Sequence, residues 1–236
     1  MKIISFIILL LLTNVLLGND NFKEGNDFYN NGKYFEAIKI YKKEVKKGLI
    51  NSKIYFNIGN SYFRLGELGK AIFYYRLAER ENPRDGDIKY NLNFAREKVK
   101  DKIDISGFNI WSKLFPFSFS ESLWGLFLFS ILFWPIFIIT QFKKVYSFTI
   151  IRNTLFFIMI LLSLNVVILN FSHSRFGVAI NSEVSVFSGI GKDNIVLFSL
   201  KEGAEFRVKN IKNDTWAQIE LNKDQRGWVQ KREIIF

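Results

Sequence analysis

Residues 55–83 read YFNIGNSYFRLGELGKAIFYYRLAERENP, and their pattern decides the fold of the N-terminal part of the chain. Small residues stand at Gly59 and Ala71, a large aromatic residue at Tyr75, and the stretch ends at Pro83. Small side chains let two helices cross closely, and an aromatic ring fills the space between helical turns. Proline ends the second helix because it cannot donate a backbone hydrogen bond. The stretch therefore predicts a pair of closely packed helices.

The same pattern occurs once more, 34 residues earlier. A shift of 34 pairs residues of like size: Gly25 with Gly59, Phe28 with Tyr62, Ala37 with Ala71, and Tyr41 with Tyr75. In residue type and spacing this resembles the tetratricopeptide repeat, a helical unit that stacks with its copies. The resemblance implies an all-α repeat domain over residues 19–105, with repeats at about 18–51 and 52–85 and a capping helix at 86–102.

The first helix of each such repeat lines a concave groove that can receive a partner. By resemblance, the partner-binding positions here are Asn26, Phe56, Asn57, Asn60, Tyr90 and Asn91, accompanied by Phe22, Tyr29 and Phe63. Some family members hold a peptide carboxylate with groove asparagines and basic residues. Asn26 and Asn57 match the asparagines. The matching basic positions hold Phe22, Asp87 and Asn91 instead. We therefore expect a groove of amides and aromatic rings; the alternative, that the asparagines only cap or solvate helices, stays open.

Two later stretches, residues 122–141 and 153–171, contain no charged residue. At a rise of about 1.5 Å per residue, each is long enough for the roughly 30 Å hydrocarbon layer of a bilayer. We expect transmembrane helices at residues 121–142 and 153–172, with a linker at 106–120 before the first.

The orientation of these spans follows from the charges between them. The expected loop, residues 143–152, holds Lys143, Lys144 and Arg152 without an acidic residue, and positive loops stay in the cytoplasm. Residues 1–18 combine one lysine with an apolar stretch, which is typical of a signal peptide or an N-terminal anchor. We expect a multi-pass protein of the cytoplasmic (inner) membrane, with its other domains on the extracytoplasmic (periplasmic) side.

Residues 176–236 change to short runs with apolar residues two apart, separated by turn residues. Five such runs predict a small all-β barrel. The strings at 184–189, 197–203, 214–216 and 227–229 resemble bacterial SH3-like domains. Trp216 and Trp228 are candidates for an aromatic ligand groove, and the alternative for Trp228 is packing at the barrel edge.

Composition excludes several kinds of chemistry. The 236 residues include no cysteine and one histidine, which excludes disulfides, cysteine nucleophiles and histidine-rich zinc sites. No phosphate-binding loop or nucleophile elbow is present. We therefore expect no catalytic residue, no metal site and no cofactor. The net charge of +11 is spread without a dense basic run, so we expect no nucleic-acid partner.

Taken in order, these parts describe a multi-domain membrane protein: repeats, a membrane hairpin and an SH3-like domain. This order resembles the BatE family of the bacterial aerotolerance (Bat) system. The resemblance implies a membrane-anchored, non-enzymatic scaffold for envelope stress or aerotolerance. Its partners would be Bat membrane proteins with von Willebrand A domains and, indirectly, a MoxR-type AAA ATPase. The alternative is a cell-wall-binding anchor, whose SH3-like domain holds peptidoglycan while the repeats recruit a wall enzyme.

Overall fold

The computed structural model describes residues 21–100, 116–142, 146–173, 176–222 and 224–236. The chain forms two compact units. The first combines the N-terminal helices with the C-terminal sheet, and the second contains two long apolar helices. The expected signal or anchor segment, and Lys143 and Lys144 of the expected loop, lie outside the described residues.

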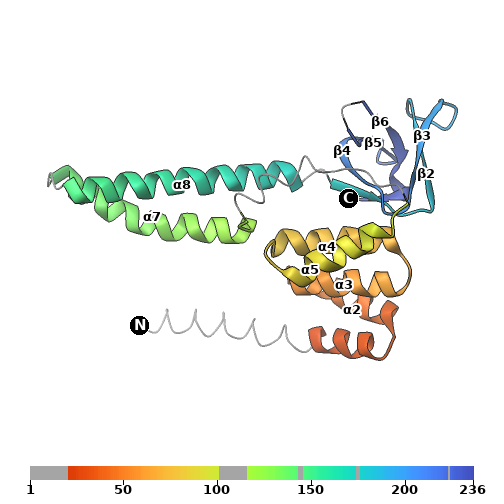
Figure 1. Ribbon diagram of the computed structural model, residues 1–236, viewed down its shortest axis with the longest axis horizontal. Coiled ribbons are helices and arrows are strands. Elements are labelled where there is room, and N and C mark those ends of the chain that lie inside the picture. The colour runs from red at the N-terminus through yellow and green to blue at the C-terminus, as the bar shows by residue number, and fades with distance from the viewer. Residues whose placement is uncertain (1–20, 101–115, 143–145, 174–175, 223) are drawn as a thin grey trace. The chain divides into compact units, whose positions relative to one another are not determined.

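The N-terminal part of the first unit is a stack of helices (Figure 1). After a helix over residues 21–30 come α2 (Tyr34–Lys46), α3 (Ser52–Arg64), α4 (Leu68–Glu81) and α5 (Gly86–Glu97). They alternate as first and second helices of two repeats, and α5 is the first helix of a third. The prediction of a helical repeat region is thereby confirmed.

Local signals fix where these helices begin and end. The side chain of Asn51 accepts a 2.9 Å hydrogen bond from the Ile54 amide at the start of α3, and Asp85 caps α5 in the same way. Three helices end at glycines with positive φ, namely Gly32, Gly48 and Gly66. Glycine is favoured there because other residues rarely adopt this conformation.

Each repeat is held together by a glycine packed under a tyrosine ring. A methyl group at Gly59 would lie 2.6 Å from a ring carbon of Tyr75, and one at Gly25 would lie 2.4 Å from the ring of Tyr41. Both tyrosines are almost completely buried, as is Ala71 at the helix crossing. Glycine is therefore required by close approach of the two helices.

The first repeat departs from the second through one polar pair. Asn21 and Glu44 stand where the second repeat has Tyr55 and Ala78. The Asn21 amide donates to Glu44 Oε1 at 3.0 Å, and Lys47 contacts the same oxygen at 2.8 Å. The buried carboxylate is thus satisfied, which explains how the first copy tolerates polar residues at positions that are otherwise apolar.

The second unit contains an antiparallel pair of long helices, α7 (Phe119–Phe142) and α8 (Tyr146–His173) (Figure 1). Both are long and apolar enough to cross a membrane. Residues 146–152, expected in the loop, belong to α8. The charge of Arg152 interrupts the apolar run but not the helix, and its guanidinium donates a hydrogen bond to the Thr140 hydroxyl at 3.2 Å. Residues 119 and 120 of the expected linker likewise belong to α7.

Polar groups within this hairpin are paired with one another. Asn165 is completely buried and donates to the Ser122 hydroxyl at 2.7 Å. The start of α7 is a capping box, in which the Ser118 hydroxyl accepts from the Glu121 amide and the Glu121 carboxylate accepts from the Ser118 amide. Such pairing suits a hairpin in lipid, where water cannot satisfy polar groups.

The C-terminal region is a separate antiparallel sheet, in the order β3-β2-β6-β5-β4-β1-β7. Its strands are β1 (Phe176–Ala179), β2 (Glu183–Phe187), β3 (Val196–Lys201), β4 (Glu205–Lys212), β5 (Trp216–Glu220), β6 (Arg226–Gln230) and β7 (Ile234–Ile235). The five apolar runs correspond to the first five strands. Strand β6 gave no alternating signal because its inward position Gly227 lacks a side chain, and β7 is only two residues long.

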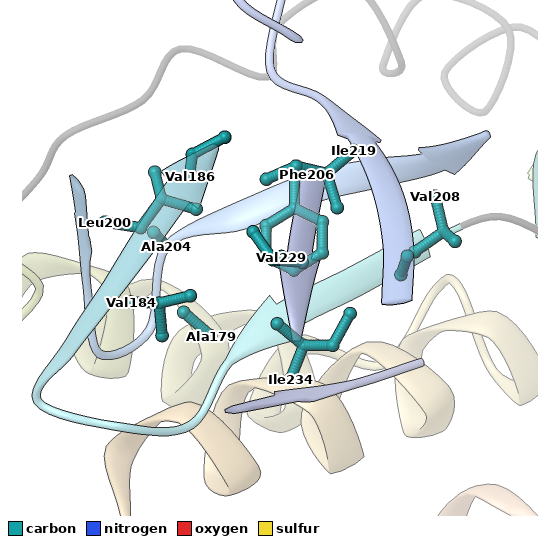
Figure 2. Close-up of a cluster of buried hydrophobic side chains, with 11 residues drawn as sticks. Ala179, Val184, Val186, Leu200, Ala204, Phe206, Val208, Ile219, Val229 and Ile234 are labelled. Carbon is teal, nitrogen blue, oxygen red and sulfur yellow. The ribbon is translucent and has the colours of Figure 1, made fainter. Parts of the chain in front are cut away.

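Alternate residues of these strands form one hydrophobic core (Figure 2). It includes Val186, Phe206, Ile219 and Val229, all at most 3% exposed. At Gly227 a methyl group would lie 2.5 Å from the Val186 side chain, so glycine is needed where β2 and β6 approach. The residues between these inward positions, including both tryptophans, face away from the core.

Candidate partner-binding surfaces

The asparagines expected in the groove form a hydrogen-bonded group between helices. Asn26 Oδ1 accepts from the Tyr41 hydroxyl at 2.8 Å and from the Asn57 amide at 2.9 Å. The Asn57 amide lies a further 3.4 Å from the Tyr41 hydroxyl. The structure therefore brings Asn26 and Asn57 together across two repeats, where their amides contribute to packing the stack.

Asn60 repeats this role one period later. The Tyr75 hydroxyl donates to Asn60 Oδ1 at 2.8 Å, and the ring of Phe56 packs at a tilt against the Tyr75 ring, with centroids 5.8 Å apart. The Asn91 amide donates to the Asp87 carbonyl of its own helix at 2.8 Å. Amide groups along this face thus have intramolecular partners.

Burial also changes the ionisation of the tyrosines beneath this face. Desolvation raises the pKa of Tyr41 to about 12, and the hydrogen bond with Asn57 opposes part of that increase. Desolvation likewise raises the pKa of Tyr75. Both hydroxyls therefore remain protonated donors at neutral pH, which fixes the direction of their bonds to Asn26 and Asn60.

The aromatic residues at the end of the face are exposed. Tyr90 is 70% exposed and Phe94 is 40% exposed, and their rings stack with an interplanar angle of 8°. Phe94 also contacts Phe63 of α3, with ring centroids 5.7 Å apart. The Lys98 ammonium lies 4.8 Å from the centre of the Phe94 ring. We call Phe63, Tyr90, Phe94 and Lys98 the aromatic patch.

Sequence reasoning placed Tyr90 and Phe63 on this face but did not select Phe94 or Lys98. The 34-residue period contains the missing signal, because Phe94 stands one period after Asn60. A phenylalanine there cannot accept a hydrogen bond through an amide oxygen as Asn60 does, and its ring is 40% exposed. The aromatic patch is therefore a local departure from the repeat.

The two tryptophans of the sheet lie on its outer face. Trp216 pairs with Gln230 and Trp228 pairs with Gln218 across β5 and β6, which makes the two tryptophans diagonal neighbours. The Trp216 ring meets the Phe187 ring edge to face, with centroids 5.6 Å apart. Phe187 is itself opposite Trp228 in the ladder. The tryptophans are thus partly covered by an aromatic cluster.

A shallow pocket of about 410 Å³ lies beside Trp216. Its lining also includes Asp214, Thr215, Gln230, Lys231 and Arg232. The Lys231 ammonium is 2.8 Å from Asp214 Oδ1, and this hydrogen bond lowers the pKa of the Asp214 carboxyl. The pocket combines one aromatic wall with charges of both signs. Across the described ranges of the chain, no cluster of three or more acidic or histidine side chains could hold a metal ion.

Comparison with known proteins identifies one segment of the helical stack. The tetratricopeptide-repeat family signature (TPR_2) matches residues 52–85. This segment is a tetratricopeptide repeat. No curated protein sequence matches the chain.

Solved structures also match the chain, and one of them shares a weak overall likeness with it. It is the Yersinia enterocolitica type III secretion chaperone SycD in complex with a peptide of the translocator YopD. The match has 14% identity and a TM-score of 0.33, and it covers 62% of this chain and 92% of SycD. At this TM-score the likeness adds nothing to the assignment of the repeat.

Proposed function

We propose that the protein is a membrane-anchored, non-enzymatic scaffold that binds a protein partner through its repeats. The observation that carries this proposal is the aromatic patch at the end of the repeat face. Tyr90 and Phe94 leave large apolar surfaces in water on a kind of domain that generally serves protein–protein interaction. Exposed tyrosine and phenylalanine are effective anchors because they bury large areas with few rotatable bonds.

The asparagines take a supporting part in this proposal. Because Asn26, Asn57 and Asn60 are bonded to neighbouring helices, they hold the face in shape. The partner then gains affinity mainly from the aromatic rings, with Lys98 adding a positive charge at their edge. A partner segment with apolar side chains and a nearby carboxylate fits this chemistry best.

Anchoring by α7 and α8 supports a location in the membrane. Their outward side chains are largely apolar and exposed, including Trp124, Phe127 and Ile131 on α7. With two spans, both flanking domains lie on one side, and the lysines between the spans favour the extracytoplasmic side. Within the first unit the repeats contact the sheet domain, which agrees with a common side.

The order of domains supports a more specific hypothesis, a BatE-type protein in an envelope stress or aerotolerance complex. The partners would then be membrane proteins with von Willebrand A domains, and indirectly a MoxR-type AAA ATPase. In this hypothesis the C-terminal sheet is the SH3-like domain.

The test is co-purification of membrane neighbours with full-length variants. Tyr90→Ala should reduce partner capture by about tenfold or more, because a central aromatic anchor typically contributes over 1 kcal/mol. Phe35→Ala is the matched control, because Phe35 on α2 is 69% exposed. Equal capture by both variants would remove the aromatic patch from the proposal.

The pocket beside Trp216 favours one second candidate, an anchor to peptidoglycan. Its aromatic wall and paired charges suit a small polar ligand. Purified sacculi discriminate between the two functions. The detergent-solubilised protein should remain in the supernatant if it is a scaffold, whereas a wall anchor should pellet and lose this property in Trp216→Ala.

A further inference from the structure

One face of α4 is covered by the sheet domain. Gly69, Ile72 and Arg76 follow at spacings of three and four, so they line a single helix face. The Gly69 amide donates to Glu202 Oε1 at 2.9 Å. Ile72 lies directly under Gly203, where an added methyl group would be 3.1 Å from its side chain.

An ion cluster holds the same surface from α5. Glu205 at the start of β4 is only 4% exposed, and it accepts two hydrogen bonds from Arg96, at 2.6 and 3.0 Å. Arg76 of α4 lies 3.5 Å from the same carboxylate. Burial disfavours the charge on Arg96, yet the bonds and charge of Glu205 raise its pKa overall. Glu205 thus pairs with one arginine from each of two helices, and Arg76 also pairs with Glu79 of its own helix at 3.4 Å.

Comparison with the residues 34 positions earlier shows which contact occupies the equivalent surface between the first and second repeats. Arg76 and Arg96 are the counterparts of Lys42 and Tyr62, which meet directly where the first repeat packs on the second. There the Lys42 ammonium donates to the Tyr62 hydroxyl at 2.7 Å. At the end of the stack the counterparts are two cations, which repel each other. The carboxylate that contacts both arginines, Glu205, comes from outside the repeats, and Glu79 of α4 pairs with Arg76 as well.

A third difference between the repeats makes room for the sheet. Gly69 is the counterpart of Phe35, and a methyl group at Gly69 would lie 2.2 Å from the Ala179 carbonyl oxygen. Gly69 is the second residue of α4, and a larger residue there would have to displace the Ala179 backbone, so close backbone approach accounts for the glycine. The second repeat thus differs from the first at Gly69 and Arg76, two of its contacts with the sheet domain, whereas Ile72 has the same residue type as Ile38.

We infer that the sheet domain caps the repeat stack, in the place that the second helix of a third repeat would take. Stacked repeats need a terminal element that covers the last apolar face and presents a polar exterior. Here the cap is connected to the stack through the membrane hairpin rather than directly. The repeats and the sheet domain then act as one body that is attached to the membrane through both α7 and α8.

The test uses the absence of cysteine to probe the surface under the cap. Ile72→Cys is introduced into the full chain in detergent, and its reaction with N-ethylmaleimide is followed. Ile38→Cys, one period earlier, is the matched control, because both isoleucines are at most 5% exposed. Each is combined with Glu205→Gln, which removes the charge, or with Gly69→Ala, which pushes the Ala179 backbone away while favouring the helix.

Both changes should accelerate labelling of Ile72→Cys by about tenfold or more. Glu205→Gln leaves buried arginine charge without its partner, which is strongly destabilising, and Gly69→Ala places a methyl group against the Ala179 backbone. Labelling of Ile38→Cys should remain unchanged. If neither change exposes Ile72→Cys, the sheet domain does not cap the stack. If both cysteines become equally reactive, Glu205 and Gly69 support the whole repeat fold, and the inference is likewise wrong.

Discussion

The Tyr75 hydroxyl donates a 2.8 Å hydrogen bond to Asn60, and Tyr41 makes the same bond to Asn26 one repeat earlier. In both repeats the tyrosine ring also covers a glycine of the neighbouring helix. The pair therefore fixes the spacing of the two helices through a ring contact and their rotation through a hydrogen bond. This recurring unit holds the face on which the aromatic patch lies.

The glycine under the ring gives the first prediction. Gly59→Ala should lower the free energy of unfolding by about 1–3 kcal/mol, because the added methyl group overlaps the Tyr75 ring. Gly86→Ala is the control, since a methyl group there meets nothing within 4 Å and alanine favours a helix. Urea unfolding of the full chain in detergent measures both. Equal stability of the two variants would contradict the packing described for Gly59.

A second prediction concerns alkaline pH. Burial raises the pKa of Tyr41 to about 12, whereas a free tyrosine ionises near pH 10. The folded state therefore keeps a proton that the unfolded state loses. The contribution of Tyr41 is complete below about pH 10 and decreases by up to about 1.4 kcal/mol per pH unit as the pH rises toward 12.

Tyr41→Phe cannot ionise and should show a shallower loss of stability above about pH 10 than the parent protein. Urea unfolding curves from about pH 9 to about pH 11.5 provide the comparison. An identical alkaline profile for parent and variant would mean that the Tyr41 hydroxyl is not buried in the folded state.

The sequence predicted the helical repeats, the two apolar helices and short strands, because each of these leaves a local pattern in the chain. The aromatic patch and the ion cluster were harder to predict. Phe94 is conspicuous only when compared with Asn60 one period earlier, and Arg96 only when compared with Tyr62. The partner of Arg96 lies 109 residues away, and no local pattern indicates such a contact.

The sheet shows the same limitation on a smaller scale. Alternating apolar residues marked β1 to β5, whereas Gly227 concealed β6 because a buried glycine carries no apolar signal. The contacts of Asn57 with Asn26 and Tyr41 were also not predictable from the sequence pattern, since the same amide could have faced solvent. The sequence therefore predicted most of the helices and strands, but it did not predict the contacts between them.

A third prediction tests the orientation in the membrane. Ser147→Cys in α8 should be shielded from an impermeant thiol reagent in intact cells, because the neighbouring lysines hold this end in the cytoplasm. Asn30→Cys in the repeats and Ser199→Cys in β3 should both react, since both positions are exposed. Lysed cells control for intrinsic reactivity. Labelling of Ser147→Cys alone in intact cells would invert the orientation.

Site-specific photo-crosslinking can show whether a protein partner binds at the aromatic patch. A photoreactive phenylalanine analogue is placed at Tyr90 in the full chain, and at Phe35 as a control of equal exposure. Cells are irradiated, and adducts of the protein are identified by mass spectrometry. We expect a discrete protein adduct at position 90 and little at position 35. Equal adducts at both positions, or none at position 90, would contradict this expectation.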